Sequence, residues 1–132
     1  LGDPPMNILS ASLSRANGDM RFDFGGTGFP ISGEPERALA KLEREEQVST
    51  GIRPSDFSVY TVRPQEPSFE SEVVVFEPLG HYGVLTAQCS GSELKVKVDK
   101  GVRPDIGTRI WLVPSSDRYY FFNPRTGESL LF

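Results

Sequence analysis

Few side chains in this sequence could do covalent chemistry. There is one histidine, His81, and one cysteine, Cys89, so a nucleophilic Ser, Thr or Cys would have a single imidazole as its base. His81 lies between Gly80 and Tyr82, in a turn where we expect an exposed side chain. Cys89 lies at the end of a predicted strand, and we expect it to be a small buried hydrophobic residue. A zinc site usually needs about four Cys or His ligands. We therefore predict no catalytic residue, no metal site and no cofactor site in this chain.

The glycine-rich stretch Gly25-Gly26-Thr27-Gly28 could cradle a phosphate if it were a P-loop. It lacks the Lys-Ser/Thr ending of that motif, and the dipeptide Gly-Lys occurs nowhere in the sequence. It also lacks a third glycine at the spacing of a dinucleotide-binding fingerprint. We interpret it as a turn between strands and do not expect nucleotide hydrolysis by this chain.

The composition limits the class of protein. The 132 residues include 13 glycines and 11 prolines, an excess that argues against a helix bundle. The net charge of -4 opposes a general binder of nucleic acids or anionic membranes, because both need a basic surface. Apolar runs are short, whereas a membrane-spanning helix needs about 20 apolar residues. A single cysteine cannot form an internal disulfide, which is compatible with a reducing compartment.

Alternating apolar and polar residues predict many short strands. Residues 8–13 and 20–24 alternate on either side of Asn17-Gly18, which is typical of a β-hairpin. Further strands are predicted at residues 29–31, 48–52, 57–62, 72–77, 84–88, 94–98, 109–113, 119–122 and 129–132. Many closely spaced short strands favour a small barrel or a sandwich.

One helix is predicted near residues 35–47. Pro35 suits a first helical turn, and the neighbouring Glu34 and Glu36 complement the positive end of the helix dipole. The charged residues 43–46 are interpreted as the solvated end of this helix. Three apolar residues share one of its faces: Ala38, Leu39 and Leu42.

Basic and aromatic residues raise the alternative of a single-stranded nucleic-acid-binding domain, because small β-barrels often stack bases on aromatic rings beside Lys and Arg. Lys95 and Lys97 alternate with apolar residues, as in any half-exposed strand. Tyr119 and Phe121 share one face of a strand whose other face carries two more aromatic rings, and at least one face is expected to be core. The acidic net charge opposes this alternative.

Five turn motifs follow one another in a specific order: Gly2-x-Pro4-Pro5-Met6-Asn7, Gly51-Ile52-Arg53-Pro54-Ser55-Asp56, Glu77-Pro78-Leu79-Gly80, Arg103-Pro104-Asp105-x-Gly107 and Phe122-Asn123-Pro124-Arg125-Thr126-Gly127-Glu128. Together they closely resemble the C-terminal regulatory region of the ATP-binding subunits of importer-type ABC transporters. The resemblance covers essentially the whole chain and is nearest to the maltose and glycerol-phosphate importer branch.

The resemblance implies a mainly β domain: an OB-type small barrel of the transport-associated (TOBE) kind, with extra strands and one short helix. Residues 1–7 would be a linker from an ATPase domain upstream, and residues 8–132 the regulatory domain. ATP and Mg would bind to that ATPase domain and not to this chain. The implied location is the cytoplasmic face of the cell membrane. The implied partners are a second copy, the ATPase domain, the membrane permease subunits and, in some members, a regulatory protein, but no nucleic acid.

The resemblance also places a dimerisation or regulatory surface at the turn after residue 76. Family members carry a Glu-x-Leu-Gly turn there, which Glu77, Leu79 and Gly80 match. This chain departs from the family by continuing with His81 and Tyr82, where many members have a polar residue and then Glu. We expect a two-fold contact between copies around these five residues.

Two further turn motifs are interpreted as structural. In the turn at residues 53–56, Pro54 sets the backbone and the Asp56 carboxylate is expected to bond the backbone amides that follow. The turn at residues 123–127 is expected to let the last strand return, with Gly127 at positive φ. The residues concerned are Arg53, Pro54, Asp56, Asn123, Pro124 and Gly127.

A small-ligand sensing module is a second alternative, because related OB-type domains of some transporter ATPases bind oxyanions or metabolites. It predicts a pocket with convergent donors from Arg53, Lys95, Lys97 or Arg103.

Overall fold

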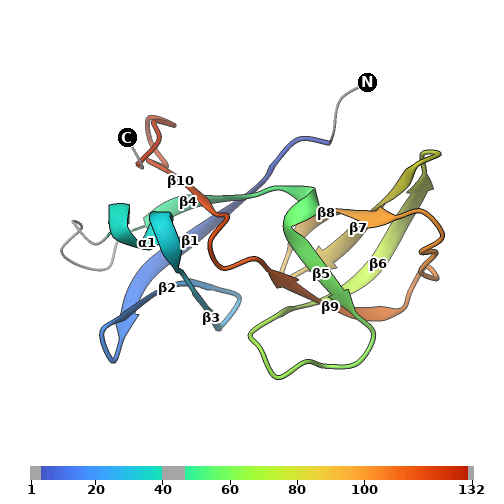
Figure 1. Cartoon of the computed structure of the whole chain (residues 1–132), viewed down its shortest axis with the longest axis horizontal. Coiled ribbons are helices and arrows are strands. Elements are labelled where there is room, and N and C mark those ends of the chain that lie inside the picture. Colours follow the sequence, from blue (N-terminus) through green and yellow to red (C-terminus); the bar gives the residue numbers. More distant parts are fainter. Residues whose placement is uncertain (1–3, 40–46, 131–132) are drawn as a thin grey trace. The chain divides into compact units, whose positions relative to one another are not determined.

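The computed structural model describes residues 4–39 and 47–130. The chain divides into two compact units, and each is assembled from separate stretches of sequence (Figure 1). Unit 1 takes the described residues up to Asn7 together with Arg53–Pro114. Unit 2 takes the described residues of Ile8–Ile52 and Ser115–Phe132. Within the described residues, the strands form one five-stranded sheet in each unit.

The sheet of unit 2 has the strand order β10-β4-β1-β2-β3. The predicted hairpin is confirmed, since β1 pairs antiparallel with β2 across a turn in which Asn17 has φ 55° and Gly18 has φ 85°. Gly25 and Gly26 make the next tight turn, between β2 and β3, also with positive φ. The strands are β1 (Asn7–Ala16), β2 (Asp19–Phe24), β3 (Thr27–Pro30), β4 (Gln47–Ile52) and β10 (Tyr120–Phe122).

Aromatic rings form the centre of the unit 2 core. Phe22 of β2 stacks on Phe29 of β3 with ring centroids 5.0 Å apart, and the Tyr119 ring meets Phe22 edge-on at 4.8 Å. Phe121 is fully buried beside them, 6.4 Å from Phe22. Tyr119 and Phe121 are thus the buried face that the alternation predicted, while Tyr120 is half-buried.

The helix α1 covers Gly33–Leu39 and begins before the predicted start at residue 35. Pro35 and Leu39 are both buried. Residues 40–46, over which the predicted helix continues, lie outside the described residues, and so do Leu42 and the charged stretch 43–46. Gln47, the predicted end of the helix, opens strand β4 instead.

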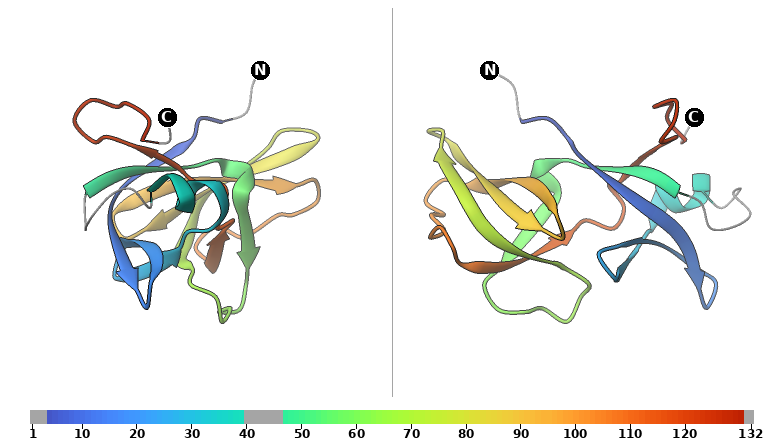
Figure 2. Two further views of the ribbon diagram at one scale, coloured as in Figure 1. Left: turned by 60° about the vertical axis from the view of Figure 1, so that its left-hand side comes forward. Right: turned by 180° about the vertical axis from the view of Figure 1, so that it is seen from behind.

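The sheet of unit 1 has the strand order β5-β9-β6-β7-β8, in which every pair is antiparallel. The hairpin that joins β6 to β7 is visible in both views of Figure 2. A register shift between Val73 and Val75 interrupts the β6–β7 ladder. The strands are β5 (Phe57–Tyr60), β6 (Phe69–Pro78), β7 (Tyr82–Cys89), β8 (Ser92–Asp99) and β9 (Arg109–Pro114), and the 3-10 helix η1 (Pro54–Asp56) precedes β5.

Alternation in β8 decides which residues reach the core of unit 1. Leu94, Val96 and Val98 are buried, whereas the intervening Lys95 and Lys97 are half-buried. The expectation of a half-exposed strand is therefore confirmed. Cys89, at the end of β7, is a buried free cysteine as expected.

The chain end differs from its prediction. We expected a closing strand at residues 129–132, but within the described residues that stretch contributes one isolated bridge, Phe122 to Ser129. Residues 131–132 lie outside the described part. In the same described part of the chain, no helix is long and apolar enough to cross a membrane.

Candidate functional site

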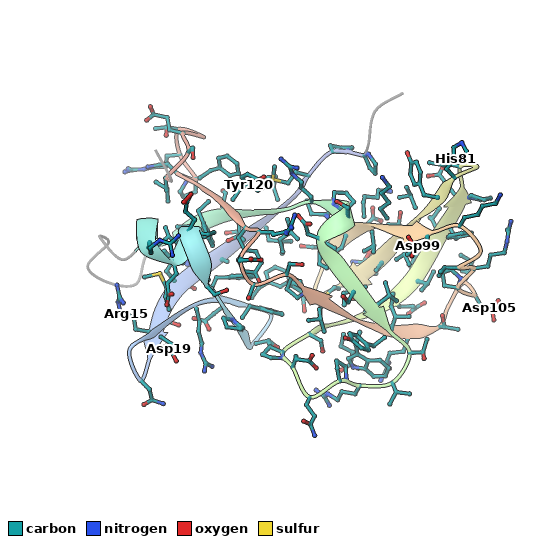
Figure 3. All side chains as sticks on the ribbon, in the orientation of Figure 1. Arg15, Asp19, His81, Asp99, Asp105 and Tyr120 are labelled. Atoms are coloured by element: carbon teal, nitrogen blue, oxygen red, sulfur yellow. The ribbon has the colours of Figure 1, made fainter. Side chains whose placement is uncertain are left out.

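The turn between β6 and β7 carries the residues predicted as a dimer or regulatory surface. The Leu79 N–H donates to the Tyr82 carbonyl at 2.8 Å, and Gly80 has φ 89°, which only glycine adopts readily. His81 lies at the tip of this hairpin, exposed as expected (Figure 3). Glu77 is also exposed, and the residue Leu79 is 50% exposed. The turn is therefore closed by a backbone bond and presents an apolar side chain and an imidazole.

A hollow of about 130 Å³ lies beside this turn. The β6–β7 hairpin forms one wall, through Phe76 and Tyr82 among others, and the turn after β8 forms the opposite wall, through Lys100 and Arg103. The Phe76 ring covers Gly83, because a Cβ atom on that glycine would lie 2.7 Å from the ring. A side chain at position 83 would therefore displace the aromatic wall.

Tyr82 connects the turn to β8. The Lys97 Nζ atom lies 4.4 Å from the centre of the Tyr82 ring, a distance at which the cation is attracted by the ring face. Antiparallel pairing explains this contact, because Tyr82 is opposite Asp99 and Val84 is opposite Lys97. Lys97 therefore touches the predicted surface from the neighbouring strand.

The turn at residues 53–56 folds as η1. The Asp56 N–H donates to the Arg53 carbonyl at 2.9 Å, and Pro54 fixes the first position and is buried. Arg53 is exposed and has extended backbone angles. The η1 segment lies against β8 in the same unit.

A second pocket, of about 260 Å³, brings together segments of unit 1 that are distant in sequence. We call it the Arg53–Lys97 pocket, and it is lined by Pro4, Met6, Arg53, Pro54, Ser55 and Lys97. The motifs that contain Met6 and Ser55 do not predict that these residues lie near Lys97, because this proximity arises from tertiary contacts alone.

The four donors expected to converge in a ligand pocket do so only in part. Arg53 and Lys97 meet in the Arg53–Lys97 pocket. Lys95 does not, since its Nζ donates to Thr86 Oγ1 at 2.6 Å across the β7–β8 pair. Arg103 lines the other hollow, beside Tyr82.

The turn at residues 123–127 lies in unit 2. The Asn123 side-chain oxygen accepts hydrogen bonds from the Arg125 N–H at 2.8 Å and from the Thr126 N–H at 3.1 Å. The Gly127 N–H donates to the Asn123 carbonyl at 2.8 Å, and Gly127 has φ 78°. Pro124, between them, is exposed.

Over residues 4–39 and 47–130, no three His, Cys, Asp or Glu side chains are grouped so that they could hold a metal ion. Glu70, on the central strand β6 of the unit 1 sheet, forms an ion pair through its carboxylate with Arg109 of β9 at 3.0 Å.

Curated proteins similar to this chain are ATP-binding proteins of ABC transporters. The "uncharacterized ABC transporter ATP-binding protein y4oS" of Sinorhizobium fredii is 34% identical over 98% of this chain and 32% of its own length. The xylose/arabinose import ATP-binding protein XacK of Haloferax volcanii is 30% identical over 98% of this chain and 33% of its own. The sn-glycerol-3-phosphate import ATP-binding protein UgpC of Burkholderia lata is 26% identical over 97% of this chain and 34% of its own length. The chain therefore spans about a third of the length of these relatives.

A solved structure of the cytoplasmic molybdate-binding protein ModG, with molybdate bound, has a similar fold. The TM-score is 0.67 at 17% sequence identity, over 89% of this chain and 96% of that chain. At this identity the likeness shows a shared fold alone.

Two protein-family models also match the sequence. The model of the MalK OB fold domain matches residues 2–57, and the model of the TOBE domain matches residues 50–122, more than half of the chain. The predicted mainly β fold of the OB type, with one short helix, is thereby confirmed. The chain belongs to the TOBE domain family and, with its MalK-type OB fold, to the C-terminal region of ABC importer ATP-binding proteins.

Proposed function

We propose that this chain is the regulatory and dimerisation domain of an ABC importer's ATP-binding subunit, and that the importer carries a sugar or a polyol phosphate. The relatives that import xylose and arabinose or sn-glycerol-3-phosphate support this solute class. The catalytic work, with ATP and Mg, belongs to an ATPase domain joined through residues 1–7. That subunit sits at the cytoplasmic face of the membrane with its permease partners.

The observation that carries the dimerisation role is the half-exposed Leu79 on a turn closed by the Leu79–Tyr82 backbone bond. An ordered turn loses little conformational entropy when it docks, so an apolar side chain presented there favours association. A two-fold contact would bring the same turn from both copies together. Glu77, Gly80 and His81 would then lie at the contact.

A lasting contact of this kind has a physical purpose in an ATPase pair. Two nucleotide-binding domains that separate in each cycle reassociate faster when a second contact, between the C-terminal domains, keeps the two subunits close together. Such a tether sets a high effective concentration, on the order of millimolar for short flexible links. A regulatory protein that bound the same turn would alter that tether.

The test of dimerisation is the solution mass of the full ATP-binding subunit carrying Leu79→Asp. We expect the variant to shift from dimer towards monomer in sedimentation equilibrium without ATP. The matched control is Val62→Asp, because Val62 is 76% exposed in a loop away from the turn. An unchanged dimer in the Leu79 variant, or equal weakening in both variants, would refute a contact at this turn.

The solute class is tested separately, by uptake of labelled sugars and polyol phosphates into cells that lack the subunit and cells in which it is restored. We expect restored uptake of one of these solutes. Restored uptake of an unrelated solute alone would contradict the solute assignment and leave the dimerisation result unaffected.

A further inference from the structure

The Arg53–Lys97 pocket is held by interactions within unit 1. The Asn7 side chain forms two hydrogen bonds with the Lys95 backbone, which fix the preceding residues, Met6 among them, beside β8. Lys97 follows two positions later on the same strand, and its side chain is on the same side of the sheet as that of Lys95. The opposite wall is η1, whose Pro54 is buried. All the lining residues therefore belong to one unit, with anchors on both sides.

The chemistry of the lining favours an anion. Its described residues include the guanidinium of Arg53, the ammonium of Lys97 and the hydroxyl of Ser55, and no carboxylate. Two cations in one pocket stand out in a chain of net charge -4. Arginine offers a planar fork that matches phosphate oxygens, and lysine a compact charge, so the pair suits a dianion better than a monoanion.

The remaining walls are apolar. Pro4, Met6 and Pro54 give the pocket a side that would contact carbon atoms and not oxygens. The volume of about 260 Å³ is below the roughly 300–1,000 Å³ of pockets for drug-sized ligands, so the ligand would have few carbon atoms. We propose that the Arg53–Lys97 pocket binds a small phosphate monoester, with the phosphate between Arg53 and Lys97 and its short carbon chain against Met6 and Pro54.

The position of Lys97 gives this site a connection to the hairpin turn. Its ammonium contacts the Tyr82 ring at 4.4 Å, and Tyr82 ends the turn that contains Leu79. A phosphate in the pocket would compete with the ring for the same ammonium. Binding of the monoester does not require that the turn be a dimer contact, so the site and the proposed function can fail independently.

The test is isothermal titration calorimetry of the 132-residue chain at low ionic strength. It measures the heat of binding of three probes: ethyl phosphate, inorganic phosphate and acetate. We expect ethyl phosphate to bind most tightly, because it alone has both the dianion and a carbon chain. Lys97→Gln and Arg53→Gln should each weaken this binding by at least about tenfold, since each removes a charge-assisted hydrogen bond. Two exposed cations outside the pocket provide matched controls, and Lys100→Gln and Arg63→Gln should bind as the wild type does.

The wild-type chain also gives a readout that no substitution can disturb. Amide chemical shifts in a ¹H–¹⁵N spectrum should move on addition of ethyl phosphate at Ser55, Met6 and Lys97, with smaller changes in unit 2. The proposal is overturned if ethyl phosphate gives no saturable heat, if all four variants lose binding equally, or if the shift changes cluster elsewhere. Tighter binding of inorganic phosphate than of ethyl phosphate would overturn the assignment of an ester.

Discussion

The side chain of Asn7 pairs with the backbone of Lys95 as a neighbouring strand would. Its Oδ1 accepts the Lys95 N–H at 2.7 Å, and its Nδ2 donates to the Lys95 carbonyl at 2.9 Å. β8 is an edge strand of the unit 1 sheet, so this amide satisfies two backbone groups that no strand reaches. Asparagine carries both a donor and an acceptor at the required separation, which alanine and aspartate do not.

Asn7→Ala should therefore destabilise the chain by about 1–3 kcal/mol, because two hydrogen bonds are lost and part-buried backbone groups are left without partners. Urea unfolding followed by circular dichroism measures this. Gln65→Ala removes an exposed amide from a loop and serves as the control, for which we expect no change. Equal stability of the Asn7 variant and the wild type would contradict the role of the amide.

Tyr119 should make stability fall at alkaline pH. Burial raises the pKa of the Tyr119 phenol above its ordinary value, and the negative charge of Asp117 adds to the effect. The folded state then keeps the proton while the unfolded state releases it above about pH 10, so stability decreases as pH rises through that value. Urea midpoints measured from about pH 8 to about pH 11 should show this decrease.

The matched variant for this measurement is Tyr119→Phe. Its urea midpoint should depend less on pH in the alkaline range, and at neutral pH its stability should equal or exceed that of the wild type. The Tyr119 hydroxyl is buried without a hydrogen-bond partner among the described residues, so its removal leaves nothing unsatisfied. An alkaline decrease that persists unchanged in Tyr119→Phe would assign it to another group.

Gly83→Ala should cost about 1–3 kcal/mol, because the added Cβ atom would lie 2.7 Å from Cε1 and 2.8 Å from Cζ of Phe76. The cost should disappear when Phe76 is first replaced by alanine. A double-mutant cycle measures this coupling by urea unfolding. If the cost were the same in both backgrounds, it would come from the backbone and not from the ring.

Gly127→Ala should destabilise unit 2 by about 1–2 kcal/mol, since Gly127 has φ 78° and a Cβ atom is unfavourable there. Gly127→Asn should cost less, because asparagine tolerates this region better than other residues with a side chain. Thermal unfolding monitored by circular dichroism measures the stability of both variants against the wild type. If Gly127→Asn were less stable than Gly127→Ala, the conformational explanation would be contradicted.

Local pattern was sufficient for most of the strands and for the two faces of β8, but not for the closing strand expected at residues 129–132, of which the described residues form one isolated bridge. Alternation placed Leu94, Val96 and Val98 in the core and left the intervening lysines half-buried on the other face, because the period of a strand is two whatever its partners are. The Asn17-Gly18 turn was predictable for the same reason, since its backbone angles are set by those two residues.

Partners across the sequence could not be predicted in this way. Asn7 was expected at the end of a linker, but its hydrogen-bond partner Lys95 is 88 positions away. The meeting of Arg53 with Lys97 and the capture of Lys95 by Thr86 likewise depend on which strands are adjacent. Side-chain types and spacing do not tell which distant segments are adjacent. The small-ligand alternative could therefore name possible donors, but only the structure shows that Arg53 and Lys97 share a pocket.

The division of the chain into interleaved segments has a consequence for its synthesis. The chain passes from one unit to the other after Asn7, Ile52 and Pro114. The sheet of unit 1 needs β9, which pairs with both β5 and β6, and the sheet of unit 2 needs β10 at its edge. On the ribosome, neither sheet can be completed until the last part of the chain has emerged. A product cut short before residue 109 would carry unpaired strands from both units and should be cleared by proteases or aggregate.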